Sequence, residues 1–110
     1  MKVKKTNRSW YVGKKENIKI YEKAKIELNS NEQIGFIDKN GSDIYEICKK
    51  IWGFYLSPSI NKRLKNYNHK IYLTKDKFNK VLIMAVRLNQ LKKFKNYCKS
   101  ESLKYKILKY

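Results

Sequence analysis

A run of six residues, Val81–Val86, is apolar at every position and carries no charge. Because successive side chains of a strand point to opposite faces, a strand of this composition needs cover on both sides. We therefore expect it to be a central strand of a sheet. The chain has 110 residues, enough for one such core, so the covering layers must come from a single domain.

Three segments between residues 10 and 38 have the pattern of short strands rather than helical periodicity. Residues 10–12 predict a short strand, and residues 13–17 predict a turn. From 18 to 28 the apolar residues share one parity, which predicts a strand with a break or bulge at Glu22. A further short strand is expected over 33–38, where an Asn-Gly pair closes it.

The middle of the chain predicts two helices in succession. Apolar residues over 43–55 are spaced by three and one, the pattern of an amphipathic helix. Ser42 is its expected N-cap residue. Ser57 and Pro58 have the residue types of an N-cap and a first helical position, and they predict a second helix over 58–67.

The remainder of the chain predicts a strand over 70–74, a loop over 75–79, the strand at 81–88, a helix over 90–99 and a strand over 103–107. We predict an α+β fold: a single small domain with a mixed or antiparallel sheet and about three helices, in the order β-β-β-α-α-β-β-α-β.

The ends of the chain differ in character. Residues 1–8 are polar and basic and are expected to form a flexible N-terminus before a domain at 9–110. We find no apolar run long enough to cross a membrane and no secretory signal peptide. The expected location is therefore the cytoplasm. Cys48 and Cys98 are far apart and are expected to be reduced thiols in the core.

The charge is strongly positive, with 27 Lys and Arg against 9 Asp and Glu and a net charge of +18. A low-GC genome would enrich lysine through its A/T-rich codons, but codon usage does not explain where acids are missing. Residues 56–110 contain 15 basic and 2 acidic residues, whereas residues 1–55 contain 12 and 7. This asymmetry predicts that the C-terminal half faces a polyanion such as nucleic acid. A merely soluble basic surface is the alternative.

A helix pair followed by a basic hairpin, over about residues 43–88, is the order of elements in a winged helix. The segment 57–65 resembles the recognition helix of winged helix-turn-helix proteins, although strands precede the first helix here. The resemblance implies a set of residues that face a DNA groove, Ser59, Asn61, Lys62, Arg63 and Lys65, and a wing that contacts phosphate, Lys75, Lys77 and Lys80. An ordinary capped helix packed on a sheet is the alternative interpretation.

Aromatic residues alternate with lysines through the C-terminal half, a pattern typical of proteins that bind single strands by stacking bases on rings. Tyr72 and Phe78 are the expected stacking rings, and burial of such rings in the core is the alternative. The full set of candidate nucleic-acid-binding residues is Ser59, Asn61, Lys62, Arg63, Lys65, Lys70, Tyr72, Lys75, Lys77, Phe78, Lys80, Lys92, Lys93, Lys95 and Lys99.

These features predict a non-enzymatic nucleic-acid-binding protein without cofactor or metal, because no Ser–His–acid set, metal-ligand cluster or Gly-rich phosphate loop is present. RNA or single strands are favoured over duplex DNA, since arginine is scarce and aromatic residues are not. The target sequence and the oligomeric state are left open.

Two other functions fit the size and charge. The first is a phage or mobile-element inhibitor, such as an anti-CRISPR protein that blocks an RNA-guided effector, with an acidic or nucleoprotein partner. The second is a metal-independent ribonuclease toxin, whose candidate residues are Arg63, His69, Arg87 and Tyr105.

Overall fold

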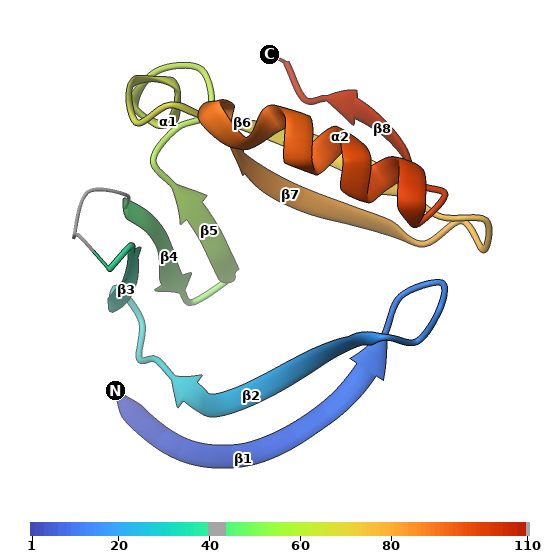
Figure 1. The fold of residues 1–110 in the computed structure, drawn as a ribbon. Coiled ribbons are helices and arrows are strands. Elements are labelled where there is room, and N and C mark those ends of the chain that lie inside the picture. Colours follow the sequence, from blue (N-terminus) through green and yellow to red (C-terminus); the bar gives the residue numbers. More distant parts are fainter. Residues whose placement is uncertain (40–43, 110) are drawn as a thin grey trace.

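The computed structural model describes residues 1–39 and 44–109 and shows a small α+β domain with three antiparallel sheets (Figure 1). The first sheet is a long hairpin of β1 (Lys2–Val12) and β2 (Ile18–Glu27). The second has the order β3–β4–β5, formed by Gln33–Ile37, Ile44–Lys50 and Gly53–Ser57. The third has the order β7–β6–β8, formed by Val81–Arg87, His69–Lys75 and Lys104–Ile107. The helical elements are α1 (Arg63–Asn66), a 3₁₀ turn η1 (Leu88–Gln90) and α2 (Leu91–Ser100).

The α+β class is confirmed, but the described residues contain two α-helices where the sequence predicts three. The predicted strands at 18–28, 33–38, 70–74 and 103–107 and the helix at 90–99 are confirmed, with small changes at their ends. Neither described α-helix is long and apolar enough to cross a membrane.

The β1–β2 hairpin is longer than the sequence predicts, because β1 begins at Lys2, where Lys2 pairs with Glu27. The irregularity expected at Glu22 is present, but the extra residue lies on the opposite strand, between Lys5 and Arg8. Arg8 forms an ion pair with Glu22 at this point, with Nη2 3.1 Å from Oε2. The turn is closed by the Glu16 N–H, which donates to the Gly13 carbonyl at 3.0 Å.

The helix predicted over 43–55 is wrong, because this segment is the β4–β5 hairpin. Its β-branched and aromatic side chains fit a pleated sheet better than a helix. Gly53 has a φ of +145°, a conformation that no helix contains and that side chains with a Cβ rarely adopt. Pairing of β4 with β3 on one side and β5 on the other outweighs the helical spacing. The expected cap at Ser42 lies outside the described residues.

The helix predicted over 58–67 shrinks to the four residues of α1. Ser57 is not its N-cap, because Ser57 ends β5 and its hydroxyl donates to Glu46 Oε2 at 3.0 Å. The chain turns through residues 59–62 instead, where the Leu64 N–H donates to the Ser59 carbonyl at 2.9 Å. The helix pair expected of a winged helix is therefore a hairpin followed by a single helical turn.

The central strand predicted over 81–88 is β7, which lies at the edge of its sheet. The central strand is β6, with β7 on one side and β8 on the other. Val81, Leu82 and Ile83 are all exposed, Ile83 to 63%. These side chains are exposed because, among the described residues, a helix covers one face of this sheet and not both. That helix is α2, which packs Phe94 against Tyr72 and Tyr105.

The core lies almost wholly in the C-terminal half of the chain. Its buried side chains come from α1, β6, β7 and α2 and are Leu64, Ile71, Tyr72, Thr74, Val86 and Cys98, joined by Cys48 of β4. The radius of gyration is 15.6 Å, larger than the roughly 13 Å typical of a compact domain of this length. Figure 1 shows why: the β1–β2 hairpin and the β6–β8 sheet are separate arms on either side of the β3–β5 sheet.

Candidate nucleic-acid interface

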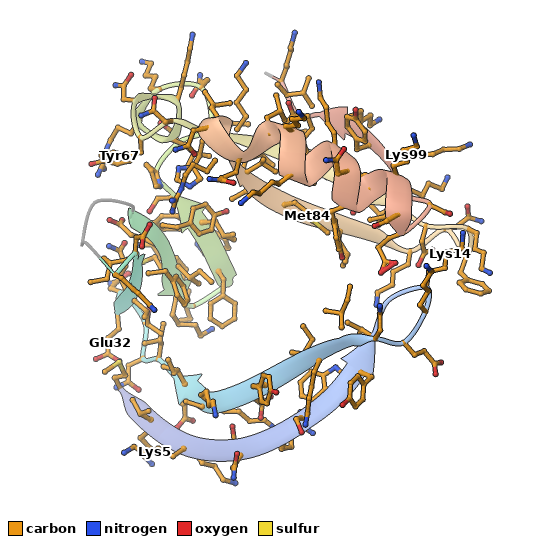
Figure 2. The ribbon with its side chains drawn as sticks, in the orientation of Figure 1. Lys5, Lys14, Glu32, Tyr67, Met84 and Lys99 are labelled. Atoms are coloured by element: carbon orange, nitrogen blue, oxygen red, sulfur yellow. The ribbon has the colours of Figure 1, made fainter. Side chains whose placement is uncertain are left out.

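The lysines of α2 form the most continuous part of the predicted surface. Lys92, Lys93, Lys95 and Lys99 are all exposed, while Cys98 and Phe94 turn toward the sheet. The helix is therefore amphipathic, with its cations toward solvent, as the sequence predicts. Lys99 extends from α2 away from the sheet (Figure 2).

The loop between β6 and β7 presents three further predicted lysines, Lys75, Lys77 and Lys80, all exposed. Asp76 gives this loop its shape, because its Oδ1 accepts the N–H groups of Phe78 at 2.8 Å and Lys80 at 2.9 Å. Phe78 is 79% exposed, and the Lys77 ammonium lies 5.1 Å from its ring centroid. This predicted stacking ring is therefore available to a ligand.

Tyr72, the other predicted stacking ring, is only 8% exposed. Its ring packs against Phe94 at 5.1 Å and against Tyr105 at 6.0 Å, measured between centroids. A base cannot reach a ring enclosed in this way, so we remove Tyr72 from the candidate site. The competing interpretation, burial in the core, applies to this residue.

The predicted groove-facing residues Ser59, Asn61, Lys62, Arg63 and Lys65 are all exposed. They do not share a helix face, since α1 starts only at Arg63. Asn61 and Lys65 instead line a pocket of about 250 Å³ together with Lys70. The rest of its lining is Ile60, Ile71, Ile107, Leu108 and Lys109.

Sequence reasoning missed Lys109 as part of this pocket. It reaches the pocket because the chain after β8 returns to β6, where the Leu108 N–H donates to the Ile71 carbonyl at 2.8 Å. Lys65, Lys70 and Lys109 thus come together from three separate segments. The pocket lining contains no acidic residue.

The described lysine side chains do not form ion pairs. Within the part of the chain that the structure describes, the ion pairs are formed by the N-terminal ammonium, Arg8 and Arg87, and none by a lysine side chain. Both acids of the C-terminal half bind backbone instead: Asp76 as above, and Glu101 by accepting the Lys14 N–H at 3.0 Å. The positive charge is therefore left to solvent or to a ligand.

A second cationic surface, on the β1–β2 hairpin, was not among the predicted site residues. The register places Tyr11 opposite Lys19 and Ser9 opposite Tyr21, so these side chains share one face of the hairpin. The Lys19 ammonium lies 5.6 Å from the Tyr11 centroid and 5.3 Å from that of Tyr21. We call this the lysine–tyrosine face, and its members are Lys2, Lys4, Ser9, Tyr11, Lys19, Tyr21, Lys23, Lys25 and Glu27.

The signal for this face is present in the sequence. Lys19, Tyr21, Lys23 and Lys25 share one parity of the predicted strand, opposite to its apolar residues. The charge asymmetry between the two halves of the chain does not reveal this face, because it lies in the half with the smaller net charge. Figure 2 shows side chains projecting on both sides of the hairpin.

The four candidate ribonuclease residues are not brought together. His69 and Arg87 are cross-strand neighbours on β6 and β7, but Tyr105 pairs with Thr74, five residues further along β6. That separation is roughly 16 Å along the strand, and Tyr105 and His69 lie on opposite faces. Arg87 is engaged by Asp38, with Nη2 2.7 Å from Oδ2.

Both cysteines are free and buried, as the sequence predicts. Burial raises the pKa of the Cys98 thiol, which favours its protonated and less reactive form.

The comparisons with known proteins add no candidate, because the chain matches no protein-family model, no curated protein and no solved structure.

Proposed function

We propose that this protein is a non-enzymatic nucleic-acid-binding protein that holds RNA or other single strands mainly through their phosphates. The observation that carries this proposal is that the lysines which the structure describes form no ion pair with a carboxylate. The chain has 24 lysines, and none of those that the structure describes pairs with a carboxylate. A polyanion can supply the negative charge that pairs with these lysines. Release of the counterions bound to the polyanion makes this association favourable.

The kind of cation favours contact with the backbone over base readout. Lysine presents a point charge rather than the bidentate fork that recognises guanine, and the chain has only three arginines. The lysines are spread over α2, the β6–β7 loop and the pocket at Lys65, and so can follow a flexible strand rather than one groove. Exposed Phe78 adds a ring on which an unpaired base can stack.

The proposal is tested by fluorescence anisotropy with labelled single-stranded RNA, single-stranded DNA and duplex DNA across a salt series. We expect tightest binding to single strands at about 50 mM salt, and a fall of about 10³-fold or more by 200 mM if six or more phosphates are contacted. Absence of binding to all three ligands at the lowest salt would overturn the proposal. RNA incubated with the protein in EDTA should stay intact, and cleavage would count against a non-enzymatic role.

A further inference from the structure

We propose that the lysine–tyrosine face of the β1–β2 hairpin is a second binding surface, specific for single-stranded nucleic acid. In this arrangement bases stack on Tyr11 and Tyr21 while the surrounding lysines contact phosphates. The inference rests on the proposed function and adds to it the surface that distinguishes a single strand from a duplex.

The register of the hairpin sets the spacing of the two rings. Tyr11 lies directly opposite Lys19, and Tyr21 is two residues further along β2, so the two tyrosines are diagonal neighbours on one face. Diagonal neighbours in an antiparallel pair lie about 7–8 Å apart, within reach of large side chains. Sheet surfaces that present exposed aromatic rings are a recurrent platform for unpaired bases.

Both rings are open to solvent, with Tyr11 59% and Tyr21 58% exposed. Their close neighbours on this face are lysines: Lys19 lies near both rings, and the Lys23 ammonium is 5.5 Å from the Tyr21 centroid. Stacking of a base on an exposed ring contributes more binding free energy than contact of an ammonium with the same ring. A base can therefore displace a lysine from a ring, and the released ammonium can move to the adjacent phosphate.

The positive charge of the lysine–tyrosine face is complementary to the phosphate backbone of a single-stranded nucleic acid. Five lysines lie on this face, and its one carboxylate, Glu27, is at the end of β2 beside Lys2. Glu22 and Lys5 point to the opposite face, according to the same register. The five cations can thus bind phosphates along the length of the hairpin, with Glu27 as the one carboxylate among the members of this face.

A duplex cannot use the rings, because its bases are already stacked and paired inside the helix. The lysines of this face can still contact duplex phosphates, but the contribution of Tyr11 and Tyr21 requires unpaired bases. The rings should therefore affect single-strand affinity alone. This selectivity separates stacking from general electrostatic attraction.

The test compares Y11L/Y21L with the wild type by anisotropy on single-stranded RNA and duplex DNA at low salt. Leucine keeps apolar contacts within the hairpin, so circular dichroism and the melting temperature should change little. We expect single-strand affinity to fall about tenfold for each ring lost, with duplex affinity unchanged. The matched control Y11F/Y21F keeps both rings and should bind within about twofold of the wild type.

The outcomes separate this inference from the proposed function. If the wild type binds single strands and Y11L/Y21L binds them equally well, the hairpin surface is excluded while the proposed function stands. Equal losses on single strands and duplex would also exclude stacking. If the wild type binds no nucleic acid, the proposed function itself fails.

A second pair of variants tests the cations. K19Q/K23Q removes two charges from the face, and K5Q/K15Q removes two exposed charges that lie on the opposite face and in the turn. The salt dependence of single-strand binding should decrease by about 1 in slope for each lysine that contacts phosphate. We expect this decrease for K19Q/K23Q only, and equal slopes for both variants would overturn the assignment.

Discussion

The β1–β2 hairpin and the β6–β8 sheet contain the same two kinds of residue, lysine and tyrosine, and use them in opposite ways. In the β6–β8 sheet the ring of Tyr72 is enclosed by Phe94 and Tyr105, and its lysines point outward from α2 and the loops. In the hairpin Tyr11 and Tyr21 stay in solvent beside lysines. In this protein a ring is therefore buried or exposed according to whether a helix covers its sheet.

The largest expected contrast concerns phosphate contacts. Neutralising six cations of the C-terminal half, K62Q, R63Q, K65Q, K92Q, K93Q and K95Q, should lower duplex affinity at about 50 mM salt by about 10³-fold. Neutralising five in the N-terminal half, K14Q, K15Q, K19Q, K23Q and K25Q, should affect duplex binding far less. Anisotropy on duplex and single strands measures both sets. Equal losses on duplex would remove the distinction between the two regions.

The next contrast concerns stability. Leu64 is fully buried, whereas Ile20 of the hairpin is 39% exposed. Leu64→Ala should therefore reduce the free energy of unfolding by about 3 kcal/mol, through lost burial and a residual cavity. Ile20→Ala should cost less than about 1 kcal/mol. Urea denaturation of both variants measures this, and similar values would mean that the hairpin has its own core.

A smaller effect is expected where the two regions touch. The Lys14 N–H donates to both Glu101 oxygens, at 3.0 and 3.2 Å, and a Cβ on Gly13 would overlap Glu101 Oε1. Gly13 also has a φ of +96°, which disfavours any other residue. We expect Gly13→Ala and Glu101→Ala each to cost about 1 kcal/mol in thermal unfolding.

Because both substitutions disturb one contact, the double variant should lose less than the sum of the two single losses. Strict additivity would show that the hairpin tip is not anchored at Glu101. Lys15→Ala, in the same turn, serves as the control.

The smallest effect is a dependence on pH within the hairpin. The hydrogen bond from the Arg8 side chain lowers the pKa of the Glu22 carboxyl from its ordinary value of 4.5. A lowered carboxyl pKa contributes stability that is present above about pH 4.5 and is lost as the pH falls through the folded-state value. On acidification to about pH 3, the melting temperature of Glu22→Gln should therefore fall by less than that of the wild type. An equal decrease in both proteins would rule out a role for this ion pair.

The elements that sequence alone predicted well are those with unambiguous local patterns. The aliphatic residues of 18–28 share one parity, interrupted at Glu22, and this segment forms β2, while residues 90–99 have a clear helical stripe and form α2. The segment 43–55 misled because its apolar residues fit the helical spacing, whereas β4 and β5 depend on pairing with β3. Pairing partners distant in sequence leave no trace in a local periodicity.

The candidate site likewise contains residues that local patterns predict and residues that depend on contacts between distant segments. Exposure of the α2 lysines followed from their place opposite the apolar stripe of one helix. The pocket at Lys65, Lys70 and Lys109 could not be predicted, since it depends on a backbone contact between Leu108 and Ile71. The lysine–tyrosine face required the register of β1 against β2, which the bulge between Lys5 and Arg8 shifts by one residue.

Composition and local spacing are enough to establish the α+β class, the excess of positive charge after residue 55 and the parity of side chains on β2, because these are properties of the chain itself. Which side chains are covered depends instead on contacts between segments that are far apart in the sequence. The tertiary structure placed β7 at an edge, buried Tyr72 under Phe94 and left Tyr11 and Tyr21 in solvent. Burial depends on the number of layers available, and the described residues form one long helix with which to cover three sheets.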